Sequence, residues 1–142
     1  MLVLDVSVAL SWLLADGKPA DRAYVDGVLD ALRSPDLRAL VPVTWGLEIA
    51  NVVARAEARD LVTEAQSEVF LDMLSCLAIQ TDPATSVHAL TDTLYLARRY
   101  GLSSYDATYL ELALRAGLPL ATLDVDLAKA ARRAGVKRFG TR

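Results

Sequence analysis

Short runs of apolar residues alternate with longer stretches of helical periodicity along the chain. The aliphatic runs LVLDV, LRALVPV, CLAIQT and LATLD predict strands, and VKRF near the C-terminal end predicts one more. Helical patterns lie between them, over VALSWLLA, from Thr44 to about Arg59, over about 63–75 and 84–100, and in two later stretches. This alternation is typical of a parallel sheet with helices on both faces. We expect a single domain over residues 1–142, a three-layer α/β/α sandwich with about five strands.

One of the later helical stretches, SSYDATYLELA, carries a carboxylate on its apolar side. Ser103 has the position of an N-cap, and the helix that it begins aligns Thr108 and Glu111 on a polar stripe with Arg115. Asp106 falls on the opposite side, in line with apolar residues such as Leu110, Ala113 and Leu114. A carboxylate on an apolar face is costly unless a partner compensates it.

Two further aspartates follow predicted strands. In open parallel sheets, ligands bind outside the carboxyl ends of the strands, and Asp5 and Asp124 both fall at such ends. Asp124 has an alternative role as the N-cap of the last helix, whereas Ser7 already offers a cap after the first strand, so Asp5 is less easily explained in this way. Asp126 has the alternative role of an acidic residue in the first helical turn, where it complements the helix dipole.

Other candidate residues have ordinary structural roles by pattern alone. Glu48 shares a stripe with Asn51 and Arg55, which is typical of a solvated helix face. His88 lies on a predicted amphipathic helix and Cys76 in a predicted strand, and neither has a partner in the sequence that would indicate nucleophilic catalysis.

Composition narrows the class of protein. Hydrophobic residues make up 54% of the 142 residues, which excludes a polar disordered chain. No apolar run approaches the roughly 18 residues of a membrane helix, and Asp5 interrupts the first apolar stretch, so we expect a cytoplasmic protein without a membrane span or secretory signal. A single cysteine and a single histidine exclude a disulfide framework and a Cys/His zinc site.

Charge is unevenly distributed. The formal net charge of −3 argues against binding of nucleic acid through overall basicity. The C-terminal 14 residues nevertheless contain six basic residues and no acidic one: Lys129, Arg132, Arg133, Lys137, Arg138 and Arg142. The first three of these favour the C-terminal turn of a helix that ends near Gly135, and attraction of phosphate groups is the alternative role.

Three stretches together resemble the PIN-domain ribonucleases of the VapC toxin type: LDVSVALSWLL, VPVTWGLEIANVVARA and LSSYDATYLELALRAGLPLATLDVDLAKAARRAGV. In that family one aspartate follows the first strand, a glutamate lies in a Glu-x-x-Asn helix, a second aspartate begins a YDA helix and a third follows a strand like LATLD. The resemblance therefore implies a PIN-like fold with an acidic site formed by Asp5, Glu48, Asp106 and Asp124.

The resemblance also bears on the residues around that site. Asp126 occupies a position that is often acidic in the family, and Ser7 and Thr122 match small hydroxyl residues that line its site. Lys129, Arg132 and Arg133 are the candidates for contact with the substrate.

The chemistry that the resemblance implies is metal-dependent cleavage of RNA. Carboxylates without thiolate or imidazole select hard cations such as Mg²⁺ or Mn²⁺, and four converging negative charges would repel one another without one. A bound metal ion can lower the pKa of a coordinated water and polarise a phosphodiester. We expect Asp5 and Asp106 to be metal ligands, with Glu48 and Asp124 completing the pocket or orienting the water.

The resemblance further implies a cognate antitoxin that obstructs the site, and a homodimer. The leading hypothesis is thus the endoribonuclease toxin of a type II toxin–antitoxin pair. The alternatives are a PIN nuclease of RNA processing, a phosphoacceptor signalling domain and a binding module without catalysis. A phosphoacceptor domain normally has a lysine after its last core strand, and Lys18, Lys129 and Lys137 do not match that position.

Overall fold

A parallel sheet lies at the centre of the computed structural model, which describes residues 1–140. Its strands are β1 (Leu2–Leu4), β2 (Ala39–Val41), β3 (Ile79–Thr81) and β4 (Leu120–Ala121), in the spatial order β3-β2-β1-β4. The register pairs Val3 with Leu40 on one side and with Leu120 on the other, so β1 is an interior strand. The predicted parallel α/β sheet is confirmed. The residue after β1 lies in the middle of the carboxyl edge of the sheet, between the ends of β2 and β4.

The fifth strand predicted over VKRF is reduced to one parallel bridge, between Leu120 and Arg138. The N–H of Leu120 donates to the carbonyl of Lys137, and the N–H of Phe139 donates to the carbonyl of Leu120, both at 2.9 Å. Gly140 then adopts a φ of +80°, which turns the backbone away from the extended path. The segment borders β4 without extending the sheet.

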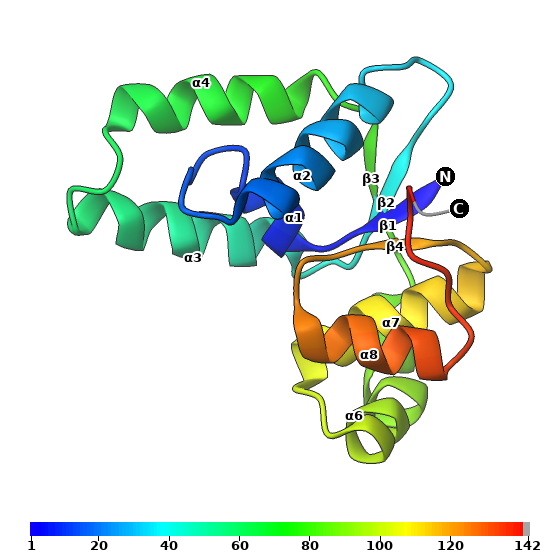
Figure 1. Ribbon diagram of the computed structural model, residues 1–142. Helices are drawn as coiled ribbons and strands as arrows, with labels where there is room; N and C mark the ends of the chain where they lie inside the picture. The colour runs from blue at the N-terminus through cyan, green and yellow to red at the C-terminus, as the bar shows by residue number, and fades with distance from the viewer. Residues whose placement is uncertain (141–142) are drawn as a thin grey trace.

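Helices cover both faces of the sheet (Figure 1). One layer contains α1 (Val6–Leu10), α2 (Pro19–Leu32), α3 (Trp45–Ala58) and α4 (Glu64–Ser75). The other contains α6 (Leu94–Tyr100), α7 (Ser104–Ala116) and α8 (Val125–Arg133). Figure 1 shows α3 and α4 as a hairpin that projects beyond the sheet. None of the helices in the described part of the chain has the length and apolar character that crossing a bilayer requires.

The helix α2 is absent from the elements predicted by the sequence pattern. Pro19 occupies its first turn, where a missing N–H costs nothing, and Val25, Val28 and Leu32 form its buried stripe. The indole N–H of Trp12 donates to the carbonyl of Val25 at 2.9 Å and ties α2 to the segment after α1. That segment was predicted as helix through residue 15, but α1 ends at Leu10.

The helix predicted over 84–100 is divided into three pieces. α5 (Thr85–His88) leads into the π-helical turn η1 (Ala89–Thr93), and α6 then continues to Tyr100. A π-turn inserts one extra residue into the helical path, which shifts the faces that the sequence periodicity would assign. The side chains that η1 presents to α7 therefore could not be read from a 3.6-residue repeat.

The helix α7 is the central helix of its layer. Residues 107–113 are all buried, and α7 packs against both β1 and β4. The stripe predicted as polar is buried as well, since Glu111 is only 5% exposed, whereas Leu114, predicted on the apolar face, is 42% exposed. Because α7 is enclosed along most of its length, its first turn is held in place together with Asp106.

Substitution of two glycines by alanine should change the free energy of unfolding in opposite directions. Gly101 ends α6 with a φ of +64°, whereas Gly27 lies inside α2 with nothing within 4 Å of an added Cβ. We expect Gly101→Ala to lower the free energy of unfolding by about 1 kcal/mol, because a Cβ strains the left-handed conformation. Gly27→Ala should raise it by about 0.5–1 kcal/mol through helix propensity. Urea denaturation measures both, and shifts of the same sign would contradict this geometry.

Candidate functional site

Four acidic residues predicted from the sequence lie at the starts of four helices. Asp5 is the N-cap of α1 directly after β1, Glu48 and Asp106 are in the first turns of α3 and α7, and Asp124 is the N-cap of α8. The carboxylate of Asp124 accepts from the N–H of Leu127 at 2.7 Å, so its predicted capping role is also present. The charge of Asp5 interacts with those of the other three, as the pKa shifts described below indicate.

Asp5 is the most deeply buried of the four, at 2% exposure. The hydroxyls of Ser7 and Thr122 both donate to its Oδ2, each at 2.6 Å. The hydroxyl oxygens accept in turn from backbone N–H groups, Ser7 from Leu123 at 2.9 Å and Thr122 from Asp124 at 3.0 Å. This network joins the loop after β1 to the loop after β4. It gives Ser7 and Thr122 a positioning role beside the carboxylate.

Burial raises the pKa of Asp5 above its ordinary value of 3.8. The hydrogen bonds from Ser7 and Thr122 oppose that rise, and the nearby charge of Asp124 adds to it. The net direction is upward, so these hydrogen bonds do not fully compensate for the loss of water around the carboxylate.

Glu48 lies in the site rather than on the solvated face that its spacing indicates. Its Oε1 accepts from the hydroxyl of Tyr109 at 3.1 Å and from that of Thr44 at 3.4 Å. Burial raises the pKa of Glu48, and the charges of Asp5 and Asp106 raise it further against the hydrogen bond from Tyr109. Only the family resemblance identified Glu48 in the sequence.

Tyr109 was missed in the sequence, although its position carries a signal. It is fully buried on α7 and three residues after Asp106, so both lie on the same face of the helix. Its own pKa is raised by burial and by the neighbouring charges of Asp5 and Glu48, so the phenol is held as a hydrogen-bond donor. A tyrosine one turn after a candidate ligand is a pattern that sequence reasoning could have used.

Asp106 is partly buried at the start of α7, and its backbone N–H donates to the side chain of Ser103 at 3.1 Å, as the predicted cap requires. Burial raises the pKa of its carboxyl group, followed in size by the charges of Asp124 and Asp5. Asp126 contributes a smaller increase from an exposed position in α8. Asp126 is therefore near the site but is not enclosed by it.

The candidate substrate contacts separate into two groups. Lys129 and Arg132 line a groove that also includes Asp124. Arg133 instead lies over the ring of Tyr100, with 5.3 Å between the guanidinium carbon and the ring centre. Arg142, the last of the six predicted basic residues, lies outside the described residues.

No basic side chain within residues 1–140 forms an ion pair with Asp5, Glu48, Asp106 or Asp124. The pKa values of Asp5, Glu48 and Asp106 are raised, which is the response of carboxylates that are partly desolvated and repel one another. The donor atoms are all oxygens of the kind that Mg²⁺ and Mn²⁺ prefer. The residues present therefore fit a hard divalent cation.

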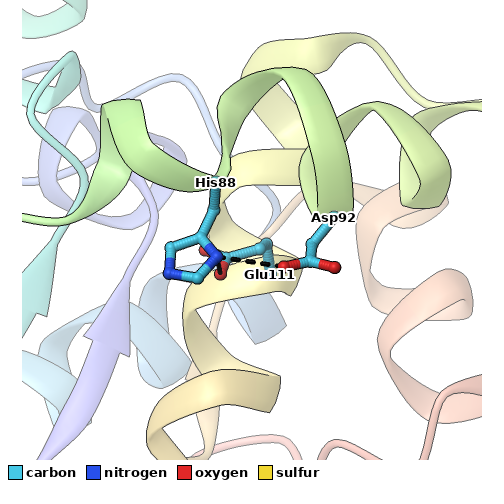
Figure 2. A group of neighbouring side chains, drawn as sticks. All are labelled: His88, Asp92 and Glu111. Carbon is cyan, nitrogen blue, oxygen red and sulfur yellow. Dashed lines mark hydrogen bonds and ion pairs between the residues drawn. The ribbon is translucent and has the colours of Figure 1, made fainter.

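A second group of possible ligand atoms lies elsewhere, between the end of α5, η1 and α7 (Figure 2). His88, Asp92 and Glu111 each offer an atom within 4.8 Å of the others. The Nδ1 of His88 is 3.0 Å from Asp92 Oδ2 and 3.6 Å from Glu111 Oε1. Arg115 donates to both oxygens of Glu111, at 2.7 and 3.1 Å, so the charge of this carboxylate is already compensated.

The same guanidinium extends the group to the end of β3. Arg115 Nη2 lies 2.6 Å from Asp82 Oδ2. Burial raises the pKa of Asp82, but the hydrogen bonds from Arg115 and the backbone N–H of Ala84 outweigh it and hold the pKa below the ordinary value. We interpret this group as an ion-pair network that fixes α7 against its neighbours, in contrast to the uncompensated carboxylates around Asp5.

Comparison with known proteins adds information at the level of family and fold. A family model described as PIN domain matches residues 2–133. The crystal structure of PAE2754 from Pyrobaculum aerophilum superposes with a TM-score of 0.63 at 23% sequence identity, covering 91% of this chain and 84% of that chain. That likeness shows a common fold. No curated protein matches the sequence significantly.

The two kinds of acidic environment predict opposite effects on stability. We expect Asp106→Asn to raise the Tm of the metal-free protein at pH 7 by about 2–6 °C, because it removes a charge that the fold disfavours. The raised pKa sets the pH dependence: the destabilisation is fully present above the raised pKa and disappears as the pH falls through it towards 3.8. The difference from wild type should therefore shrink with acidification.

Asp82→Asn is the matched control for this measurement by thermal denaturation. The lowered pKa of Asp82 means that its carboxylate stabilises the fold above pH 3.8 and that this stabilisation is lost as the pH falls through the lowered pKa. The variant should therefore have a lower Tm than wild type at pH 7. A lower Tm for both variants would contradict the assignment of Asp106 to an uncompensated cluster.

Proposed function

The chain belongs to the PIN domain family, and from this premise we propose that it is a divalent-metal-dependent endoribonuclease that acts as the toxin of a type II toxin–antitoxin pair. Membership of the family supports a nuclease in general terms. The observation that supports metal dependence is that the charge of Asp5 interacts with those of Glu48, Asp106 and Asp124, and that none of the four has a basic partner among the described residues. Carboxylates without a basic partner destabilise the fold unless a bound cation offsets their charge, and such groups are frequent at functional sites.

In this proposal Asp5 and Asp106 hold Mg²⁺ or Mn²⁺, with Glu48 and Asp124 beside them and Asp126 at the margin. A divalent cation bound there would lower the pKa of a coordinated water and offset the negative charge of the scissile phosphodiester. Ser7 and Thr122 fix the orientation of the Asp5 carboxylate through their two hydrogen bonds. This positioning matters because ligand geometry controls how well a site selects its metal.

Glu48 is the residue that we assign to the attacking water. Its pKa is raised towards neutral pH, which suits a group that accepts a proton during hydrolysis. Tyr109 and Thr44 donate to the same oxygen of Glu48 and hold its carboxylate in one orientation. Tyr109 is thus a positioning residue in this account.

The proposal of an antitoxin partner is supported by an apolar groove of about 740 Å³ between the segment after α1 and the loop before α4 together with α4 itself. Trp12, Phe70 and Met73 line it, and Leu61 and Val69 remain 65% and 71% exposed there. Exposed apolar surface of this kind is typical of a partner site. An antitoxin segment of complementary apolar character is the occupant that the family resemblance implies.

The proposed homodimer draws support from a different surface. Val87, Leu90 and Tyr95 are exposed on successive turns of α5, η1 and α6. Exposed large apolar side chains favour association, and a second copy of the chain is the partner that we propose for them.

The nuclease proposal predicts a sharp difference between the two acidic groups. We expect Asp5→Asn and Asp106→Asn each to reduce cleavage of RNA in Mg²⁺ or Mn²⁺ by about 100-fold or more, because each removes a charge from the metal site. EDTA should abolish cleavage by the wild-type protein. Gel analysis of labelled total RNA measures the rate.

Asp92→Asn is the control, since it removes an equally charged carboxylate from the ion-pair network of His88. It should leave the rate within about twofold of wild type, as is usual for substitutions remote from the reaction. Full activity in folded Asp5→Asn or Asp106→Asn protein would reject the assignment of the site.

The toxin proposal predicts growth arrest when the chain alone is induced in a bacterial host. The arrest should be absent with Asp106→Asn, because the proposed cause is cleavage of RNA at the acidic site. Co-expression of the product of the neighbouring gene should relieve it, and optical density over several hours measures both effects. Normal growth with active, soluble wild-type enzyme would favour a PIN nuclease of RNA processing over a toxin.

A further inference from the structure

A second groove lies beside the acidic site and has a different character from the apolar one. It has a volume of about 830 Å³ and runs between α8, the end of β4 and the segment 135–138. Thr122 and Asp124 form part of its wall. Thr122 also donates a hydrogen bond to Asp5, and Asp124 is one of the four acidic residues, so the groove borders the acidic site through these two residues.

The groove carries most of the basic residues of the C-terminal region. Four of them line it: Lys129, Arg132, Lys137 and Arg138. The acidic residues of the lining are Asp21 and Asp124, so even without Arg138 the formal charge of the lining is +1 in a chain whose net charge is −3. The guanidinium of Arg138 lies 3.7 Å from the centre of the Tyr24 ring, and the inference does not depend on it.

The helix dipole accounts for only part of this charge. Arg132 is in the last turn of α8, where a basic residue stabilises the helix. Lys129 lies in the middle of the helix and Lys137 lies beyond its end, so neither compensates the terminal carbonyl groups. All three side chains are exposed, and none forms an ion pair within the described residues.

We propose that this groove binds a single strand of RNA next to the scissile phosphate, with Lys129, Arg132 and Lys137 contacting phosphates. The inference rests on the proposed nuclease function and assigns the substrate's path across the protein. Apolar side chains, including Leu123, Val125 and Val136, form the rest of the lining. Basic residues beside apolar surface suit a single strand, whose phosphates and unpaired bases are both accessible, better than a duplex, whose bases are stacked inside.

The arrangement also resolves an electrostatic problem of the proposed reaction. An acidic pocket repels a polyanion, and the bound cation compensates only the charge close to it. Basic residues that begin five positions after Asp124 attract the adjacent phosphates and bring the strand to the pocket. The groove therefore contributes to binding of RNA, whereas the carboxylates contribute to the chemical step.

The test is RNA binding in EDTA, so that affinity is measured without cleavage. The probe is a fluorescein-labelled single-stranded RNA of about 12 nucleotides, a length typical of single-strand sites. Its anisotropy is followed with the full chain, with the double variant Lys129→Glu/Lys137→Glu, and with the control Arg59→Glu/Arg98→Glu. The control residues are exposed at the C-cap of α3 and on α6, outside the groove, and their reversal changes the net charge equally.

We expect the groove variant to raise Kd at least about tenfold and the control by less than about threefold. The slope of log Kd against log salt should fall by about 1.4 in the groove variant, which is 0.7 for each lost phosphate contact. In Mg²⁺ the groove variant should raise KM and leave kcat nearly unchanged. Thermal denaturation should show all variants folded, since the substituted side chains are exposed.

Two outcomes separate this inference from the proposed function. Equal loss of binding in both double variants, or none in the groove variant, would overturn the groove as the RNA site even if the wild-type protein cleaves RNA. Selective loss in the groove variant would support the groove even if no metal ion produced cleavage, and the nuclease proposal would then fail alone.

Discussion

The buried carboxylate of Asp5 is the constraint from which the rest of the site follows. β1 is an interior strand of a parallel sheet, and Asp5, the residue that follows it, is only 2% exposed. A carboxylate in that position needs hydrogen-bond donors, and the hydroxyls of Ser7 and Thr122 supply two at 2.6 Å. Because Thr122 lies beyond β4, the same bonds fix the loop that carries Asp124, and the burial of Asp5 therefore organises two strand ends at once.

The protein contains two kinds of buried acidic group, one with a basic partner and one without. Asp82 and Glu111 are neutralised by Arg115, and the pKa of Asp82 is accordingly lowered. The carboxylates around Asp5 have no such partner among the described residues, and the pKa values of Asp5, Glu48 and Asp106 are raised. The fold thus places a guanidinium beside Asp82 and Glu111 but, within residues 1–140, places none beside the carboxylates around Asp5, which therefore repel one another. This contrast is the physical basis for proposing a cation at one group and a structural role for the other.

Local sequence pattern predicted the features that depend on the order of strands and helices. It did not predict contacts between residues that are far apart in the chain. Asp5 and Asp124 became candidates because parallel strands bring their carboxyl ends together, and Asp106 because it falls in line with Leu110 and Ala113, which are buried. Glu48 followed only from the family resemblance, since its partner Tyr109 is 61 residues away. The link between Arg115 and Asp82, the missed α2 and the π-turn in η1 depend on packing between segments that local periodicity does not describe.

Calorimetric titration of the metal-free protein with Mn²⁺ at pH 7 tests the central claim, that the carboxylates around Asp5 form the cation site. The account predicts binding to the wild-type protein and to Asp92→Asn with similar affinity, and at least about tenfold weaker binding to Asp5→Asn. Both substitutions remove one carboxylate, so any general effect of charge is the same in each. Undiminished binding to Asp5→Asn, or loss of binding in Asp92→Asn, would contradict the account and would move the cation to the group formed by His88, Asp92 and Glu111.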